Sequence, residues 1–330
     1  MKLFKRSFTF DFGTANTVVC KNGQVVFDEP TLVSVWPDGL VEVGQEARRL
    51  LYGERMGCLG GPIGHANKYV WPISGGYVAD CDAFASYVKG VFKRLSRFPR
   101  LCSVLIAIPD DFSVDGSTFC APFYEMGIKD VRFINQSVAA SVGLGLPSDK
   151  YHLIVDCGFG KIRASLVKDS RIVKTKQWCN VSGNTWISDI QACIRSQHQL
   201  KTGRVTAEWL LVSVGAASVD ISDIPEPCSV TGPNLMTAHP VTVTLDHKDL
   251  AKVLDSSLSS FEKELDDFMK EEIMTISEDV SRDIVSDGVW LIGGGSRLRG
   301  LSERLKCSLN LQVHTTADPF AVISKGASSK

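Results

Sequence analysis

The sequence carries almost no net charge and has no long hydrophobic run. Its 330 residues include 36 Lys and Arg against 37 Asp and Glu, which gives a formal net charge of −1. Nucleic-acid-binding proteins usually show a basic stripe, so nucleic acid is not an expected partner. No apolar stretch approaches the roughly 20 residues of a membrane-spanning helix, and the first residues do not have the pattern of a signal peptide. We therefore expect a globular protein without a membrane span.

Paired cysteines and paired histidines are also missing. The ten cysteines are scattered singly along the chain, and no Cys-x-x-Cys spacing occurs. Zinc sites and secreted disulfide frameworks depend on such pairs, so neither is expected, and a reducing cytoplasm fits the pattern. The composition, 44% hydrophobic and 22% charged, is that of an ordinary globular protein long enough for two domains.

The first candidate site is an apolar strand that ends in an acid and a glycine, at residues 9–19. A tight turn at Gly13 can direct backbone N–H groups toward anionic oxygens. Phosphate would repel Asp11, so the expected role of this carboxylate is to hold the water shell of a Mg²⁺ ion. A plain β-hairpin tip is the alternative explanation. The candidate phosphate ligands are Gly13, Thr14, Ala15 and Asn16.

A second stretch of the same kind begins 145 residues later (156 minus 11). It again ends an apolar run in Asp-x-Gly, and a strand-like run follows each copy. Two such hairpins facing each other would hold one nucleotide tail between two related domains, with Asp156 as the second carboxylate near Mg²⁺. The candidate phosphate ligands here are Gly158, Phe159, Gly160 and Lys161.

A third stretch, residues 289–296, is a buried strand that opens into three glycines. Backbone without side chains can lie flat against a base or a ribose. The candidate nucleoside ligands are Gly293, Gly294, Gly295 and Ser296.

Spaced in this way, the three stretches resemble the phosphate-1, phosphate-2 and adenosine motifs of the actin, Hsp70 and sugar-kinase superfamily. Within it, the chain resembles the MreB family of bacterial actin homologues, the rod shape-determining proteins. The likeness extends to residues 28–33, 43–47, 76–80, 139–147 and 317–319.

This resemblance implies an α/β, actin-like ATPase fold in which two RNase H-like domains flank a nucleotide cleft. Each domain would carry a smaller outer subdomain. Domain I would comprise residues 1–143 and about 316–330, with its outer subdomain at about 31–73. Domain II would comprise residues 144–315, with its outer subdomain at about 180–240.

Several residues depart from the family pattern. Asn135 stands where the family has a glutamate thought to orient the attacking water, and an amide can hold a water but cannot accept its proton. Lys161-Ile162-Arg163 replaces two threonines and a glutamate. The ammonium of Lys161 could reach the terminal phosphates as a point charge, or the loop could have lost its function. Glu208 matches the family, whereas Leu211 and Ser213 replace the Lys and Glu expected beside the nucleoside.

The resemblance also implies ligands, partners and a location. ATP and Mg²⁺ would bind, and hydrolysis to ADP and phosphate would be slow because of the departures. The protein would assemble with itself into filaments in the cytoplasm, at the inner face of the cell membrane. There it would organise cell shape and cell-wall synthesis together with cell-wall elongation proteins. The alternative is a catalytically weak scaffold module that co-assembles with a competent partner.

Two segments are candidates for the membrane contact, since family members attach through an N-terminal amphipathic segment or an apolar loop. Met1–Phe8 mixes three cations with three large apolar side chains, and each cation near an anionic bilayer is worth about 1 kcal/mol. A frayed edge strand is the alternative. The second candidate is the loop Phe98–Leu101 with Arg94, Arg97 and Arg100, for which a solvated turn is the alternative.

Local patterns predict several element ends. A helix is expected to begin after Asp80 or Asp82, and a long amphipathic helix near Asp246. Asp318 and Pro319 are expected to serve as the N-cap and first residue of the last helix.

Overall fold

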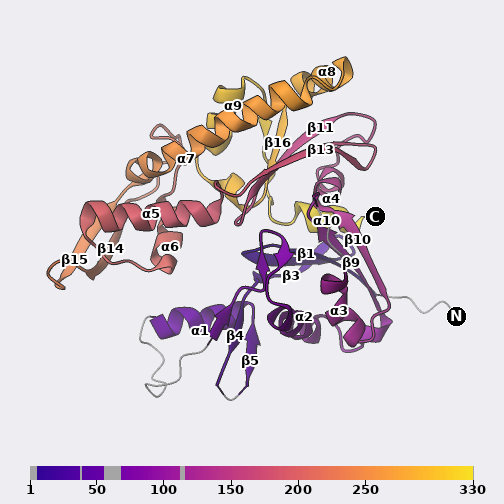
Figure 1. Ribbon diagram of the computed structural model, residues 1–330, viewed down its shortest axis with the longest axis horizontal. Coiled ribbons are helices and arrows are strands. Elements are labelled where there is room, and N and C mark those ends of the chain that lie inside the picture. The colour runs from indigo at the N-terminus through magenta and orange to yellow at the C-terminus, as the bar shows by residue number, and fades with distance from the viewer. Residues whose placement is uncertain (1–5, 38, 56–67, 112–115, 330) are drawn as a thin grey trace. The chain divides into compact units, whose positions relative to one another are not determined.

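The computed structural model describes residues 6–37, 39–55, 68–111 and 116–329. Two compact units make up the chain, and most of their helices and many of their strands are labelled in Figure 1. The first unit comprises Met1–Pro147, Ser170–Ile172 and Phe320–Lys330, and the second comprises Ser148–Asp169 and Val173–Pro319.

The first unit is built on a five-stranded sheet with the order β10-β9-β1-β2-β3. The central strand β1 is antiparallel to β2 and parallel to β9. The predicted hairpin at Asp11 is therefore confirmed. The bounds are β1 (Arg6–Phe12), β2 (Asn16–Lys21), β3 (Gln24–Pro30), β9 (Cys102–Ile108) and β10 (Asp130–Asn135).

Alternation along β1 decides what each face of this sheet contacts. Phe8, Phe10 and Phe12 point to one face and pack against α2 (Cys81–Leu95) and α3 (Ser117–Glu125). The ring centroids of Phe10 and Phe92 lie 5.7 Å apart. The opposite face, which includes Asp11, is covered by α10 (Val322–Ser328).

Two helix starts in the first unit were expected from local sequence. Asp80 caps α2 by accepting a hydrogen bond from the backbone N–H of Ala83 at 2.9 Å, as predicted. The prediction for the last helix is wrong, because α10 begins at Val322 with Ala321 at its N-cap. The carbonyl of Pro319 instead accepts a hydrogen bond from Gly293 N–H at 3.2 Å, so the residues around it form a turn.

A smaller sheet with the order β5-β4-β6 lies in the first unit, beside helix α1 (Gln45–Arg55). Leu32, Ala47 and Leu51 form its small core. A two-stranded ribbon, β7-β8, follows this sheet along the chain. The bounds are β4 (Val33–Val35), β5 (Val41–Val43), β6 (Lys68–Val70), β7 (Ile73–Ser74) and β8 (Tyr77–Val78).

The second unit repeats the topology of the first. Its sheet has the order β13-β12-β11-β16-β17, in which central β11 is antiparallel to β12 and parallel to β16. This duplication confirms the predicted α/β class and the expectation of two related domains. The bounds are β11 (His152–Cys157), β12 (Ile162–Lys168), β13 (Arg171–Trp178), β16 (Val289–Ile292) and β17 (Val313–His314).

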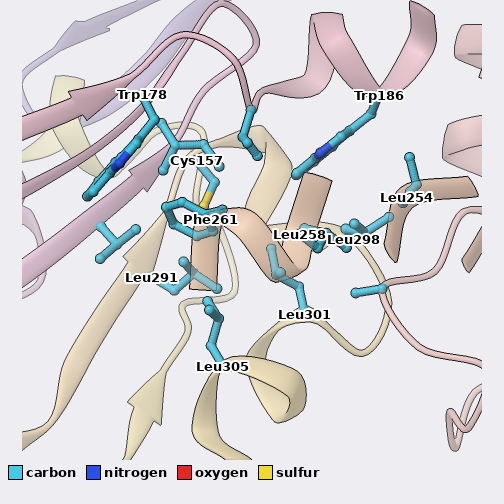
Figure 2. Close-up of a cluster of buried hydrophobic side chains, with 14 of the residues drawn as sticks. Cys157, Trp178, Trp186, Leu254, Leu258, Phe261, Leu291, Leu298, Leu301 and Leu305 are labelled. Carbon is cyan, nitrogen blue, oxygen red and sulfur yellow. The ribbon is translucent and has the colours of Figure 1, made fainter. Parts of the chain in front are cut away.

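Helices enclose a large core in the second unit. Trp178 stacks edge-on against Phe261 of α7 (His247–Asp267), with centroids 5.3 Å apart. Figure 2 shows these two rings with Cys157 and several leucines of the same cluster. Asp246 caps α7 as predicted. The other elements are α5 (Gly183–His198), α6 (Arg204–Val214), β14 (Cys228–Pro233), β15 (Pro240–Leu245), η2 (Phe268–Ile273), α8 (Glu278–Asp287), η3 (Gly294–Arg297) and α9 (Leu301–Leu309).

Candidate functional site

The hairpin after β1 turns tightly at Gly13. The N–H of Gly13 donates to the carbonyl of Asn16 at 3.0 Å, and a Cβ atom on Gly13 would lie 2.6 Å from that oxygen. Thr31 fixes the turn from the side, because its hydroxyl donates to Gly13 O at 2.7 Å and its N–H to Ala15 O at 2.8 Å. The backbone of the predicted phosphate turn is therefore rigidly placed, and only glycine fits at its first position.

The two side-chain donors expected at this turn are held in place by neighbours. The Thr14 hydroxyl accepts a hydrogen bond from Gly75 N–H at 3.1 Å, which leaves its own proton for another acceptor. The Asn16 amide donates to Asp28 at 3.4 Å.

Asp11 has a partner that the sequence did not reveal. The amide of Gln136 donates to Asp11 Oδ1 at 2.8 Å, in a buried contact between residues 125 positions apart. This amide contributes a hydrogen bond but no positive charge. The carboxylate thus keeps the acceptor chemistry that water bound to Mg²⁺ requires.

Asn135 lies at the same edge of the sheet as Asp11. It ends β10 and forms the N-cap of α4 (Gln136–Gly143), and its register across β9 places it one residue beyond Asp11. Asp110 supports this corner by accepting bonds from the N–H and the hydroxyl of Ser137. The structure therefore brings the predicted catalytic position and the predicted metal carboxylate together within one unit.

The second hairpin repeats the turn of the first. The N–H of Gly158 donates to Lys161 O at 3.0 Å, and a Cβ atom on Gly158 would lie 2.8 Å from that oxygen. The start of α5 is bound to this turn, because Asn184 N–H donates to Phe159 O at 2.8 Å. Two sequence stretches 145 residues apart (158 minus 13) thus fold into the same backbone motif.

Asp156 faces a cation instead of an amide. Arg163 lies directly opposite it on β12, and the guanidinium Nη2 is 3.4 Å from Asp156 Oδ2. Arg163 is only 2% exposed. From the sequence, Arg163 is only a departure from the family pattern. The hairpin register predicts this pair, because Asp156 lies two residues before Gly158 and Arg163 lies two residues after Lys161.

The glycine triplet packs directly against the second hairpin. Gly293 has a φ of +80°, and a Cβ atom there would lie 2.3 Å from Asp156 Oδ1. A Cβ atom on Gly295 would lie 2.9 Å from the carbonyl of Cys157. The structure therefore brings two of the three predicted stretches together. The Ser296 hydroxyl donates to Gly293 O at 2.6 Å and closes the turn that contains Gly294.

Three further candidates surround this hairpin. Lys161 is buried, and its ammonium donates to Gln177 Oε1 of β13 at 2.5 Å, so its role toward phosphate stays a prediction. The guanidinium of Arg204 lies over the Phe159 ring, with its Cζ atom 5.5 Å from the ring centroid. Glu208 lies half-buried on α6.

The buried thiol beside Asp156 belongs to the core. Cys157 points into the cluster that contains Phe261 (Figure 2). Burial, with a smaller contribution from the Asp156 charge, raises the pKa of this thiol well above its ordinary value. Cys157 is therefore a protonated packing residue rather than a nucleophile.

Magnesium fits the two carboxylates unequally. Mg²⁺ prefers carboxylate and water oxygens and keeps several of its waters, and Asp11 with its amide neighbour suits such an ion. Asp156 does not suit it, because a guanidinium already lies beside its carboxylate. Over the described ranges, no cluster of three or more His, Cys, Asp or Glu side chains could bind a metal directly.

A model of the MreB/Mbl protein family matches residues 5–330. The cell shape-determining protein Mbl of Bacillus subtilis (strain 168) is 25% identical over 337 residues, which cover 98% of this chain and 95% of the relative. The cell shape-determining protein MreB of Escherichia coli (strain K12) is 24% identical over 341 residues, covering 98% and 92%.

Solved structures share the fold over nearly the whole length. MreB5 of Spiroplasma citri bound to AMPPNP superposes with a TM-score of 0.86 at 22% identity, covering 98% of this chain and 95% of that one. The same protein bound to ADP gives the same values. The MamK double helical filament gives a TM-score of 0.74 at 16% identity and covers 98% of each chain.

Proposed function

Because this chain belongs to the MreB/Mbl family of actin-like proteins, we propose that it is a nucleotide-binding cytoskeletal protein that assembles into filaments and helps to determine cell shape. The observation that carries this proposal is the repeated hairpin. Gly13 and Gly158 make the same turn, each after the central strand of its own sheet, and the two sheets have the same topology. Relatives named as cell shape-determining proteins, and a neighbour solved with AMPPNP and ADP, support it.

The two hairpins are the proposed phosphate ligands, and the glycine triplet is the proposed nucleoside ligand. Asp11 would hold Mg²⁺ through water, and the ion would supply positive charge to the phosphates of ATP. Asn135 would hold the attacking water without accepting its proton, so hydrolysis would be slow.

Self-assembly has support in the exposed surface of the second unit. Helix α6 and the β14–β15 hairpin lie beside α5 at one end of this unit (Figure 1). Both elements carry large apolar side chains that are exposed to solvent. Val212 is 71% exposed and Met236 is 80% exposed. A head-to-tail contact that does not close would build a filament from such a surface.

A membrane contact is proposed at one edge of the first unit. Met1–Lys5 lie outside the described residues, but Arg6 pairs with Cys102, which directly follows the loop Phe98–Leu101. The described part of the first candidate segment, residues 6–8, therefore adjoins the second candidate. Phe98 and Leu101 are 60% and 44% exposed, as an apolar contact with lipid would require.

Arg94 does not belong to this surface, contrary to the prediction. Its guanidinium pairs with Glu29 at 2.7 Å and donates to Val43 O at 3.0 Å, so it links α2 to β3 and β5. Among the described helices, none has the length and apolarity needed to cross a bilayer. A contact at the bilayer surface is the form of attachment that we propose.

Pelleting and electron microscopy test assembly. At micromolar concentration, the protein is expected to form filaments with ATP and Mg²⁺, and these should persist because hydrolysis is slow. Replacement of Val212 and Met236 by Ser is expected to reduce pelleting, whereas Val285→Ser, at another exposed apolar position, serves as the matched control. A protein that stays monomeric with ATP and with AMPPNP would contradict the proposal and favour a scaffold that needs a competent partner.

Co-sedimentation with anionic liposomes tests the membrane contact. Replacing Phe98 and Leu101 by Ser should release most of the bound protein, because the apolar anchors are removed while the cations stay. Tyr124→Ser, at another exposed aromatic position of the first unit, is the control. Unchanged binding of the double variant would place the contact elsewhere.

A further inference from the structure

Arg163 places a permanent positive charge inside the second hairpin. It lies opposite Asp156 across the β11–β12 ladder, with its Nη2 atom 3.4 Å from Asp156 Oδ2. The side chain is almost fully buried. Because a guanidinium does not lose its proton in a protein, this charge is present at every working pH.

The other side of the Asp156 carboxylate is also enclosed. Its Oδ1 atom lies so near Gly293 that a Cβ atom on that glycine would be 2.3 Å away. A hydrated Mg²⁺ ion needs room for several waters in octahedral geometry. The glycine turn on one side and the guanidinium on the other leave Asp156 poorly suited to hold such an ion, and the cation would also repel it.

The equivalent position in the first hairpin differs. The residue opposite Asp11 is Val18, which carries no charge, and the amide of Gln136 is a neutral neighbour. The two carboxylates thus occupy equivalent places in two equivalent hairpins, but only Asp156 has a cation across the ladder.

We propose that Arg163 supplies, in the second hairpin, the positive charge that a divalent ion would otherwise supply there. Nucleotide binding by this chain then depends only weakly on Mg²⁺. The proposal rests on the proposed function, because it concerns the same nucleotide. Without Arg163, the charge of Asp156 would repel the phosphate tail, and the tail would bring its own Mg²⁺ to offset that repulsion.

Calorimetric titration of the full-length protein with ATP tests this, first with excess Mg²⁺ and then with excess EDTA. In the wild type, removal of Mg²⁺ is expected to raise the dissociation constant by less than about tenfold. In Arg163→Met the same removal should raise it by at least about a further tenfold, because Asp156 is then left charged beside the phosphates.

Three other variants isolate the charge. Arg163→Lys keeps the cation and should keep the weak dependence on Mg²⁺. The double variant Asp156→Asn/Arg163→Met removes both charges and should again show only a weak dependence on Mg²⁺. Lys174→Met removes a surface cation of the same unit that pairs with Glu272 at 2.9 Å, and it should behave as the wild type does. If Arg163→Met does not fold, the wild type and Arg163→Lys still decide the question.

A second measurement locates the ion. With Mn²⁺ in place of Mg²⁺, electron paramagnetic resonance of the ATP complex should report weaker Mn²⁺ binding in Asp11→Asn and unchanged binding in Asp156→Asn. Equal weakening in both variants would overturn the proposal. A wild-type affinity for ATP that falls by more than about 100-fold in EDTA would also overturn the proposal, because the charge of Arg163 would then not replace that of Mg²⁺. Failure to bind ATP in either condition would overturn the proposed function, and this inference with it.

Discussion

The two Asp-x-Gly hairpins have the same backbone and different electrostatics. In each, a glycine N–H donates to the carbonyl three residues later at 3.0 Å, and a side chain on that glycine would collide with the same oxygen. Asp11 accepts a hydrogen bond from a neutral amide, whereas Asp156 faces a buried guanidinium. A duplicated fold therefore preserves the turn, while the neighbour of each acid sets its charge environment.

The largest expected effect separates the two acids directly. Asp11→Asn keeps an acceptor for Gln136 but removes the charge, so we expect the affinity of the ATP-bound protein for Mg²⁺ to fall by about 10–100-fold. Asp156→Asn should leave that affinity for Mg²⁺ unchanged, because Arg163 already occupies the side of Asp156 that an ion would need. Calorimetric titration of both variants with Mg²⁺ in the presence of ATP measures the difference.

Thermal unfolding provides the control for this pair of variants. Asp156→Asn leaves a buried guanidinium without its carboxylate and should unfold at a lower temperature than the wild type. Asp11→Asn should unfold close to the wild-type temperature. Equal losses of Mg²⁺ affinity in the two variants would mean that the hairpins are electrostatically equivalent.

A smaller effect is expected at Asn135, which lies in the first unit, one residue beyond Asp11 in register. Asn135→Glu restores a side chain that can accept a proton from water. A well-placed general base raises a reaction rate by about 10²–10⁴-fold. We expect Asn135→Glu to raise the rate of phosphate release by only about tenfold, because the other departures from the family pattern stay. Steady-state phosphate release measures it.

The matched variant at this position is Asn135→Gln, which lengthens the side chain but cannot accept a proton. It should release phosphate as slowly as the wild type. Equal rates for the Glu and Gln variants would show that proton acceptance at this position does not limit turnover.

Much of the fold follows from local sequence. Strands that end in Asp-x-Gly, the triple glycine and the caps at Asp80 and Asp246 all lie where the sequence predicts them. These features depend on residues a few positions apart, whose backbone preferences act locally. The last helix begins later than the sequence predicts, because Pro319 lies in a turn that is hydrogen-bonded to Gly293 and does not begin the helix.

Tertiary structure alone decided the partners of the charged side chains. Gln136 reaches Asp11 across 125 positions, and Arg94 reaches Glu29 across 65, which no local pattern records. Such contacts depend on how strands and helices pack, and packing brings together residues that are distant along the chain. The sequence by itself determined that two acids stand at two glycine turns, and the packed sheets determined that one of them faces an amide and the other an arginine.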